Sequence, residues 1–199
     1  MHYSLCMWLL VCVTLGSIPA GVHATSTFYP FQPSPKDLWD LDHYKYYTWG
    51  ISWSVPAGQT IVGASLFIDN INNWRVEPNI LYVNLLDNPP VGVTVGTDNQ
   101  GGGNAFSGQG IPLTTYTDYN SYPGSAEDWI YTFTTAQVET LKSYVTNGVF
   151  GLGIDPDCHY YNDGITLTIE TVPEPVTALL ALPALGLLGR RRPPTRCAE

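Results

Sequence analysis

Residues 47–55 read YTWGISWSV, and this stretch decides the fold class. Large apolar side chains alternate with small or polar ones, which is the two-residue period of a strand that buries one face. The Pro-Ala-Gly sequence at residues 56–58 is typical of a turn. The stretch therefore predicts a half-buried strand that ends in a turn.

The same strand signal recurs toward the C-terminus, separated by joints rich in Asn, Gly and Pro. Residues 92–109 are rich in Gly and Asn and lack the helix pattern that follows a phosphate-binding loop, so a flexible loop is predicted there. Further strands are predicted at residues 60–68, 80–86, 129–133, 149–154 and 165–169.

One helix is predicted between the strands at residues 129–133 and 149–154. Thr134 and Gln137 are three residues apart and form a capping box. Val138, Leu141 and Val145 then fall on one helical face, and an Asn-Gly pair ends the helix. Several short strands and one helix predict an all-β domain, an antiparallel β-sandwich of jelly-roll-like type.

The N-terminal end indicates export. Residues 5–18 form an apolar run of the length that secretory signal peptides use. Val22 and Ala24 supply small side chains at the two positions that signal peptidase inspects. Cleavage is therefore predicted after Ala24, with Ala20 as the alternative, and residues 1–24 are predicted to be a signal peptide.

The C-terminal end carries a second sorting feature. Pro173-Glu174-Pro175 is followed by the apolar residues 176–189. An apolar run halts translocation, and arginines after it prefer the cytoplasmic side. Fourteen residues are fewer than the roughly 17–25 of a spanning helix, so a buried helix is the alternative. The arginine cluster consists of Arg190, Arg191 and Arg192.

This order of Pro-Glu-Pro motif, apolar segment and arginine cluster, within residues 172–199, resembles the PEP-CTERM sorting signal. The resemblance implies a substrate of an exosortase-like processing enzyme in a Gram-negative bacterium, in addition to signal peptidase. It also implies transient insertion of residues 176–189 into the inner membrane and a final location in the cell envelope or extracellular matrix. Exopolysaccharide is then a candidate partner.

The segment between the two ends is acidic. Residues 25–172 hold 15 of the 17 acidic residues but 4 of the 8 basic ones, which gives a net charge of −11. Such a surface repels phosphate backbones, which argues against nucleic-acid binding, and favours divalent cations. Residues 25–35 contain three prolines and are expected to form an extended leader. With the acidic segment that follows, they make up residues 25–45, and the β-sandwich is predicted at residues 46–171. Cys158 is the one cysteine between the ends and is expected to be a small buried hydrophobe, with a reactive thiol as the alternative.

Two acidic segments are similar in composition, residues 37–44 before the first predicted strand and residues 155–164 before the last. The terminal strands of a sandwich often lie side by side, so the two segments are expected to meet at one edge or end. Gathered carboxylate and amide oxygens suit calcium, which takes six to eight oxygen ligands. The predicted calcium ligands are Asp40, Asp42, Asp155, Asp157 and Asp163. The alternative is that these residues form turns by bonding the nearby backbone.

Two other binding hypotheses concern the same region. His43, Cys158 and His159 have the chemistry of zinc ligands, although adjacent residues of an extended chain point to opposite faces. Trp74 lies in a polar joint, residues 70–75, where a buried indole is unexpected. Its ring is therefore a candidate platform for stacking on a sugar.

No catalytic motif occurs in the sequence. It contains no Gly-x-Ser-x-Gly elbow, no His-Glu-x-x-His and no phosphate loop, and no catalytic residue is predicted. The leading hypothesis is an exported, non-enzymatic cell-surface or extracellular-matrix protein. The alternatives are a secreted, calcium-supported carbohydrate-binding module and an extracellular polysaccharide hydrolase, which needs only two suitably spaced carboxylates.

Overall fold

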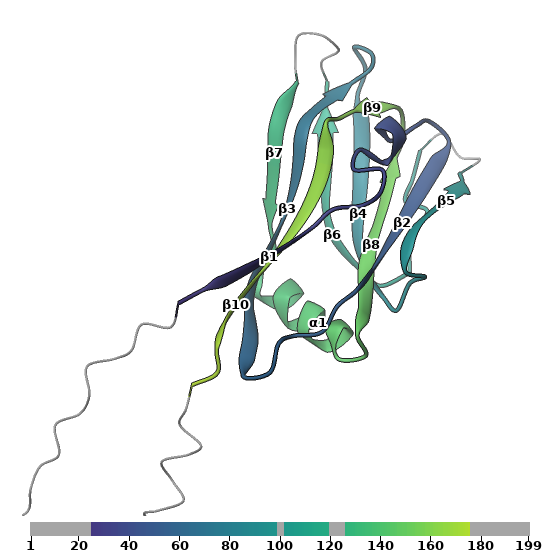
Figure 1. Ribbon diagram of the computed structural model, residues 1–199. Coiled ribbons are helices and arrows are strands. Elements are labelled where there is room, and N and C mark those ends of the chain that lie inside the picture. The colour runs from purple at the N-terminus through teal and green to yellow at the C-terminus, as the bar shows by residue number, and fades with distance from the viewer. Residues whose placement is uncertain (1–24, 99–101, 120–125, 176–199) are drawn as a thin grey trace, which may run out of the picture.

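The computed structural model describes residues 25–98, 102–119 and 126–175, which form two antiparallel sheets packed face to face (Figure 1). The first sheet has the order β1-β10-β3-β7, with β9 beside β3, and the second has the order β5-β2-β8-β4-β6. The first sheet contains β1 (Thr27–Phe31), β10 (Gly164–Pro173), β3 (Gln59–Asn73), β7 (Glu127–Thr132) and β9 (Tyr160–Tyr161). The second contains β5 (Gly92–Thr97), β2 (Lys45–Ser52), β8 (Val149–Pro156), β4 (Asn79–Asp87) and β6 (Ile111–Asp118).

The connections between strands are those of a jelly roll. When the short β5 and β9 are left aside, the two sheets read β1-β10-β3-β7 and β2-β8-β4-β6. The chain changes sheet at each connection between these eight strands except from β4 to β6. Two Greek keys wrapped into a double sheet have this order. The prediction of an all-β, antiparallel, jelly-roll-like sandwich is confirmed.

The core lies between the sheets and follows the alternation of the sequence. In β2 the side chains of Tyr47, Trp49 and Ile51 are 1%, 4% and 6% exposed, as the two-residue period predicts. On the facing sheet Leu66 and Leu167 are fully buried, in β3 and β10. One face of each sheet therefore supplies a continuous apolar interior.

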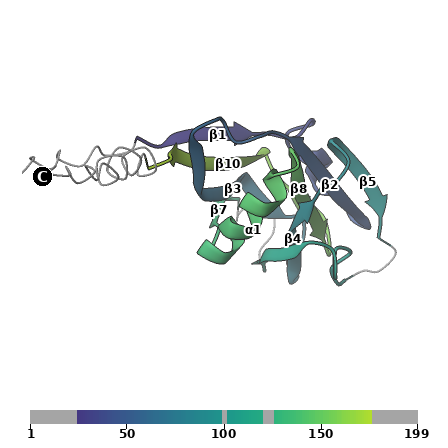
Figure 2. The ribbon, with the colours of Figure 1, turned by 90° about the horizontal axis from the view of Figure 1, so that it is seen from below.

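The helix α1 (Thr135–Val145) covers one end of the sandwich, seen from below in Figure 2. Thr134 and Gln137 form the predicted capping box, in which each side chain accepts a backbone N–H of the other residue. Its buried residues are Val138, Leu141 and Val145, so the predicted apolar face is confirmed. The opposite end carries β9 (Figure 1).

Two expectations about loops are wrong. Residues 27–31 belong to no leader, because β1 pairs along its length with β10 and extends the sandwich toward the N-terminus. Pro30 fits there because an edge strand leaves one side of its backbone unpaired. Residues 92–97 are likewise not loop but the edge strand β5, paired with β2, so the predicted loop can begin only after Thr97. The strands β6 and β9 were not predicted.

The predicted signal peptide, residues 1–24, the apolar segment 176–189 and Arg190, Arg191 and Arg192 lie outside the described residues. Within the described part of the chain, no helix has the length and apolar character needed to cross a membrane. Pro173 ends β10, opposite Gln59, and the Glu174 N–H donates to the Gly58 carbonyl at 2.9 Å. Pro173, Glu174 and Pro175 are exposed at this margin of the sandwich.

Candidate functional site

The two acidic segments meet at the end of the sandwich that carries β9. The Tyr160 N–H donates to the Leu41 carbonyl at 3.3 Å. The Asn162 N–H donates to Asp40 Oδ1 at 3.3 Å, and Asn162 Nδ2 donates to the Asp37 carbonyl at 2.9 Å. The predicted convergence is confirmed, and it follows from the pairing of the terminal strands β1 and β10.

The first of these segments contains a left-handed turn. Residues 38–41 have φ values of 50°, 57°, 60° and 41°, a conformation that costs roughly 1–2 kcal/mol for each L-residue. Leu38 and Leu41 are fully buried, and Asp37 Oδ1 accepts the Trp39 N–H at 3.2 Å. Burial and hydrogen bonds offset the backbone cost. As a consequence Trp39 faces outward and is 54% exposed.

Beside this turn lies a pocket of about 660 Å³, which we call the Trp74 pocket. Three partly exposed aromatic side chains line it: Tyr44 before β2, Trp74 directly after β3, and Tyr161 in β9. Its polar lining consists of Asp42, His43, Arg75, Glu77, Cys158 and His159. The pocket thus combines apolar ring faces with hydrogen-bonding and charged groups.

Trp74 is held on two sides. Its Nε1 donates to Cys158 Sγ at 2.8 Å, and the Arg75 guanidinium lies 4.3 Å from the centre of its ring. Its backbone N–H donates to the His159 carbonyl at 3.3 Å. These contacts fix the orientation of the indole before any ligand arrives, which reduces the entropy lost on binding.

The charges of the pocket are arranged around Asp42. Lys45 Nζ lies 2.8 Å from Asp42 Oδ2, and His159 Nδ1 lies 3.5 Å from Asp42 Oδ1. The Lys45 hydrogen bond holds the pKa of Asp42 below its usual value. The His159 Nε2 and His43 Nδ1 atoms are buried and, among the described residues, have no hydrogen-bond partner. Both nitrogens therefore have unused hydrogen-bonding capacity inside the protein.

Cys158 is more polar than expected for a small buried hydrophobe. Its sulfur accepts from Trp74 and donates to Glu77 Oε1 at 3.4 Å, and the residue is half-buried. Burial raises the pKa of the thiol, so the protonated form predominates at neutral pH. The thiol therefore forms a hydrogen-bonding link between Trp74 and Glu77.

The five predicted calcium ligands have four different sets of hydrogen-bonding or ion-pair partners. Asp40 contacts Asn162, Asp42 contacts Lys45 and His159, and Asp163 Oδ2 accepts from Asn70 Nδ2 at 2.8 Å. Asp155 and Asp157 instead accept backbone N–H groups of Ala105 and Gly103 in the loop 102–110. Among the residues the structure describes, no three His, Cys, Asp or Glu side chains are placed to hold a metal, including His43, Cys158 and His159.

Asp155 lies beneath this loop on the outer face of the second sheet. It is 1% exposed, its Oδ2 accepts the Ala105 N–H at 2.6 Å, and its Oδ1 is buried with no partner among the described residues. Burial raises its pKa to about 6, and Asp98 and Asp157 add to the effect. Next to it Phe106 packs against Gly153, where a Cβ would lie 2.7 Å from the ring.

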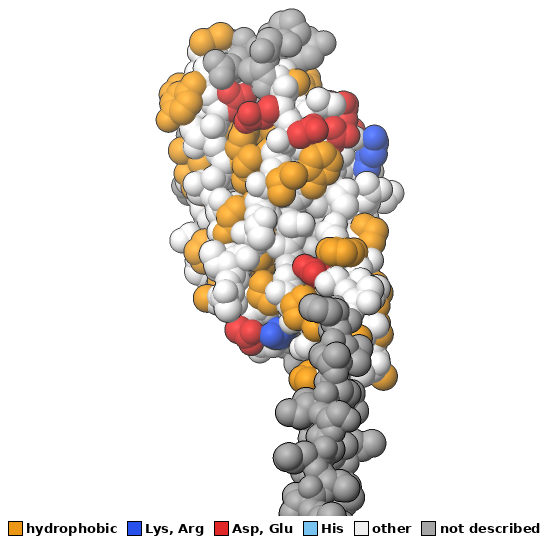
Figure 3. Space-filling model, turned by 90° about the vertical axis from the view of Figure 1, so that its left-hand side faces the viewer, with side chains coloured by type: hydrophobic (Ala, Val, Ile, Leu, Met, Phe, Trp, Pro, Cys, Tyr) orange, Lys and Arg blue, Asp and Glu red, His pale blue; other side chains and the backbone are white. Residues whose placement is uncertain are grey.

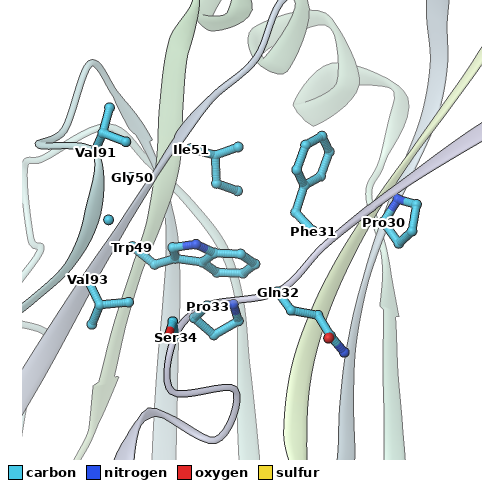
Figure 4. A pocket seen from close by; sticks show the side chains of 11 residues that line it. Pro30, Phe31, Gln32, Pro33, Ser34, Trp49, Gly50, Ile51, Val91 and Val93 are labelled. Carbon is cyan, nitrogen blue, oxygen red and sulfur yellow. The ribbon is translucent and has the colours of Figure 1, made fainter.

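A second hollow, of about 470 Å³, lies where β1 faces β2 and β5 (Figure 4). The side chains of Phe31, Trp49, Ile51 and Val93 face it, and its polar side chains are Gln32 and Ser34. Without a charged group, this hollow has fewer means of fixing a polar ligand than the Trp74 pocket.

No protein-family model matches the chain, and no curated protein matches it.

The lining of the Trp74 pocket includes residues that the sequence did not predict as site residues. Tyr44, Arg75, Glu77 and Tyr161 were not predicted. Arg75 had a detectable signal, because it is one of only four bases in residues 25–172 and is adjacent to an aromatic residue in a polar joint.

Proposed function

We propose that this chain is an exported, non-catalytic carbohydrate-binding protein of the cell envelope or extracellular matrix, and that the Trp74 pocket binds the sugar. The observation that carries the proposal is the grouping of Tyr44, Trp74 and Tyr161, which are 51%, 39% and 38% exposed, around one pocket. Single exposed aromatics are ordinary, but several around a preformed hollow indicate a ligand site.

The chemistry of the pocket matches that of a sugar. A pyranose ring presents apolar C–H groups that pack on an aromatic face and hydroxyls that require donors and acceptors. Trp74 and Tyr161 supply faces, while Asp42, Arg75 and His159 supply hydrogen-bonding groups. Jelly rolls also serve as lectin domains, which is an analogy of fold only.

The state of Asp42, one of the two carboxyl groups that line the pocket, argues against its use as an acid in hydrolysis. A glycosidase needs a general acid, and a carboxyl acts as one near neutral pH when its pKa is raised. The pKa of Asp42 is lowered instead, by its bond to Lys45. Asp42 is therefore a poor general acid near neutral pH.

The test of binding compares the native processed protein with its Trp74→Ala and Tyr161→Ala variants on a glycan array. The array includes exopolysaccharide from the bacterium that produces the protein. Each substitution should weaken binding at least about tenfold, which corresponds to roughly 1.4 kcal/mol. Phe28→Ala is the matched control, because Phe28 is 60% exposed on β1, away from the pocket. Equal binding by the native and Trp74→Ala proteins would show that the site lies elsewhere.

Export and processing are proposed from the two chain ends. The exposure of Pro173, Glu174 and Pro175 at the margin of the sandwich supports access by a processing enzyme. The mature chain should begin near Thr25 and lack residues 190–199. Replacement of the Pro-Glu-Pro motif by alanines should leave uncleaved protein in the inner membrane. Intact mass spectrometry and fractionation test this, and identical mass and location of both proteins would refute it.

A further inference from the structure

A third pocket, of about 620 Å³, lies next to the Trp74 pocket at the same end of the sandwich. Oxygen-bearing side chains line it from the left-handed turn, from β3 and from the segment between β9 and β10. They are Asp40, Asn70, Asn72, Asn162 and Asp163. Tyr161 lines both pockets, so a ligand in one is in position to affect the other. We call this hollow the Asn162 pocket.

The surroundings of the Asn162 pocket are strongly acidic. Asn70 Nδ2 donates to both Asp69 Oδ1, at 3.2 Å, and Asp163 Oδ2, at 2.8 Å. The Asn70 backbone N–H donates to Asp128 Oδ1 at 3.2 Å. Burial, together with Asp128 and Asp163, raises the pKa of Asp69. Figure 3 shows acidic side chains gathered near this end of the molecule, where a cation would relieve their mutual repulsion.

An acidic cluster alone is weak evidence, but Asn162 gives a second observation. This side chain is 6% exposed and lines the pocket, and its Oδ1 is buried with no hydrogen-bond partner among the described residues. The orientation of the amide is fixed, since Nδ2 donates to the Asp37 carbonyl and a reversed amide would place two oxygens together. A buried oxygen without a hydrogen-bond partner costs free energy, so a cation or donor that interacts with its lone pair is favoured.

We propose that the Asn162 pocket binds a calcium ion through Asp40, Asp163 and the Asn162 side-chain oxygen, with water completing the coordination. Calcium takes six to eight oxygens from carboxylates, amides and water in tolerant geometry, whereas magnesium requires a tight octahedron. Two carboxylates and one amide predict an affinity in the range of extracellular modules, a Kd of roughly 0.1–1 mM.

The ion would also stabilise the left-handed turn. Asn162 already bonds Asp40 and the backbone of Asp37, so a shared cation would tie the turn to the β9–β10 connection. Because Tyr161 precedes Asn162 and lines both pockets, the ion would also order one wall of the Trp74 pocket. Calcium binding stands on its own, while this coupling to sugar binding rests on the proposed function.

The experiment measures thermal unfolding and calorimetric calcium binding of the native processed protein after chelation. At about 10 mM calcium the melting temperature should rise by roughly 3–10 °C, with a much smaller rise in magnesium. Asp163→Asn and Asp40→Asn should each weaken calcium binding at least about tenfold. Glu139→Gln, on the exposed side of α1 at the opposite end, removes the same charge and should keep the full response. Asp157→Asn should keep it as well.

Three results would overturn the site: no effect of calcium, an equal effect of magnesium, or a response that survives both Asp163→Asn and Asp40→Asn. A response lost in Asp157→Asn but kept in Asp163→Asn would place the ion beneath the loop 102–110 instead. The coupling is tested separately by sugar affinity with and without chelator. If the sugar affinity is unchanged by the chelator, only the coupling is refuted. If no sugar binds, the proposed function is refuted, while the calcium titration still decides the ion site.

Discussion

Asp155→Asn should stabilise the protein at neutral pH, because the native carboxylate is buried with one oxygen unpartnered. Its pKa is 3.8 in the reference state and about 6 in the fold, a difference that corresponds to roughly 3 kcal/mol of unfolding free energy. Asparagine keeps an acceptor for the Ala105 N–H and carries no charge to desolvate. For a domain of this size, a gain of about 1–3 kcal/mol raises the melting temperature by roughly 2–12 °C.

The size of this stabilisation depends on pH. Between pH 3.8 and about 6 the folded state of the native protein binds more protons at Asp155 than the unfolded state. Its stability therefore falls as the pH rises through this window, and the deficit is complete above about pH 6. The Asn variant lacks this deficit, so the two melting temperatures should agree near pH 4 and separate by pH 7.5.

Calorimetric scans of both proteins at pH 4 and pH 7.5 measure this difference, with Glu139→Gln as the control for lost surface charge. Glu139 is exposed on α1 and pairs only with Lys142 in the described structure. A variant that is less stable than the native protein at pH 7.5, or offset equally at both pH values, would refute the reasoning about Asp155.

Two further substitutions test the packing that positions the sites. Thr134→Ala removes one half of the capping box of α1 and should lower the free energy of unfolding by about 1 kcal/mol. The melting temperature should fall by roughly 2–4 °C, and no change would mean that the cap is dispensable. Gly153→Ala places a Cβ 2.7 Å from the buried Phe106 ring and should cost about 1–3 kcal/mol, with earlier proteolysis in the loop 102–110. A loop as resistant as the native one would show that Phe106 does not hold it down.

The interior of this fold was predictable because burial imposes a period on the sequence. Tyr47, Trp49 and Ile51 alternate with smaller residues, since one face of β2 must contact the opposite sheet. The edge strands carry no such constraint. In β5 the residues are mostly exposed and flanked by glycines, so its composition is that of a loop, and only pairing with β2 makes it a strand.

The meeting of the two acidic segments was predictable from topology, but the direction of each carboxylate was only partly so. Asp155, in β8, and Asp157, just after it, are two residues apart, and both accept N–H groups of the loop 102–110. This two-residue spacing was visible in the sequence and predicts one side of the chain for both aspartates. The packing of the loop 102–110 over them was not visible, because it depends on contacts between residues about 50 positions apart.

The left-handed turn at residues 38–41 connects the two proposed sites and could not be predicted from its sequence. Asp40 is of a type that adopts this conformation occasionally, but Leu38, Trp39 and Leu41 are not, so local preference opposes the turn. It forms because Leu38 and Leu41 are buried together and because Asn162 holds Asp37 and Asp40 from the other chain segment. A conformation imposed by tertiary contacts in this way places Asp40 at one pocket and leaves the bulky Trp39 exposed. Backbone strain that is retained at a concave, polar end of a sandwich is more readily explained by ligand binding than by stability, to which it contributes unfavourably.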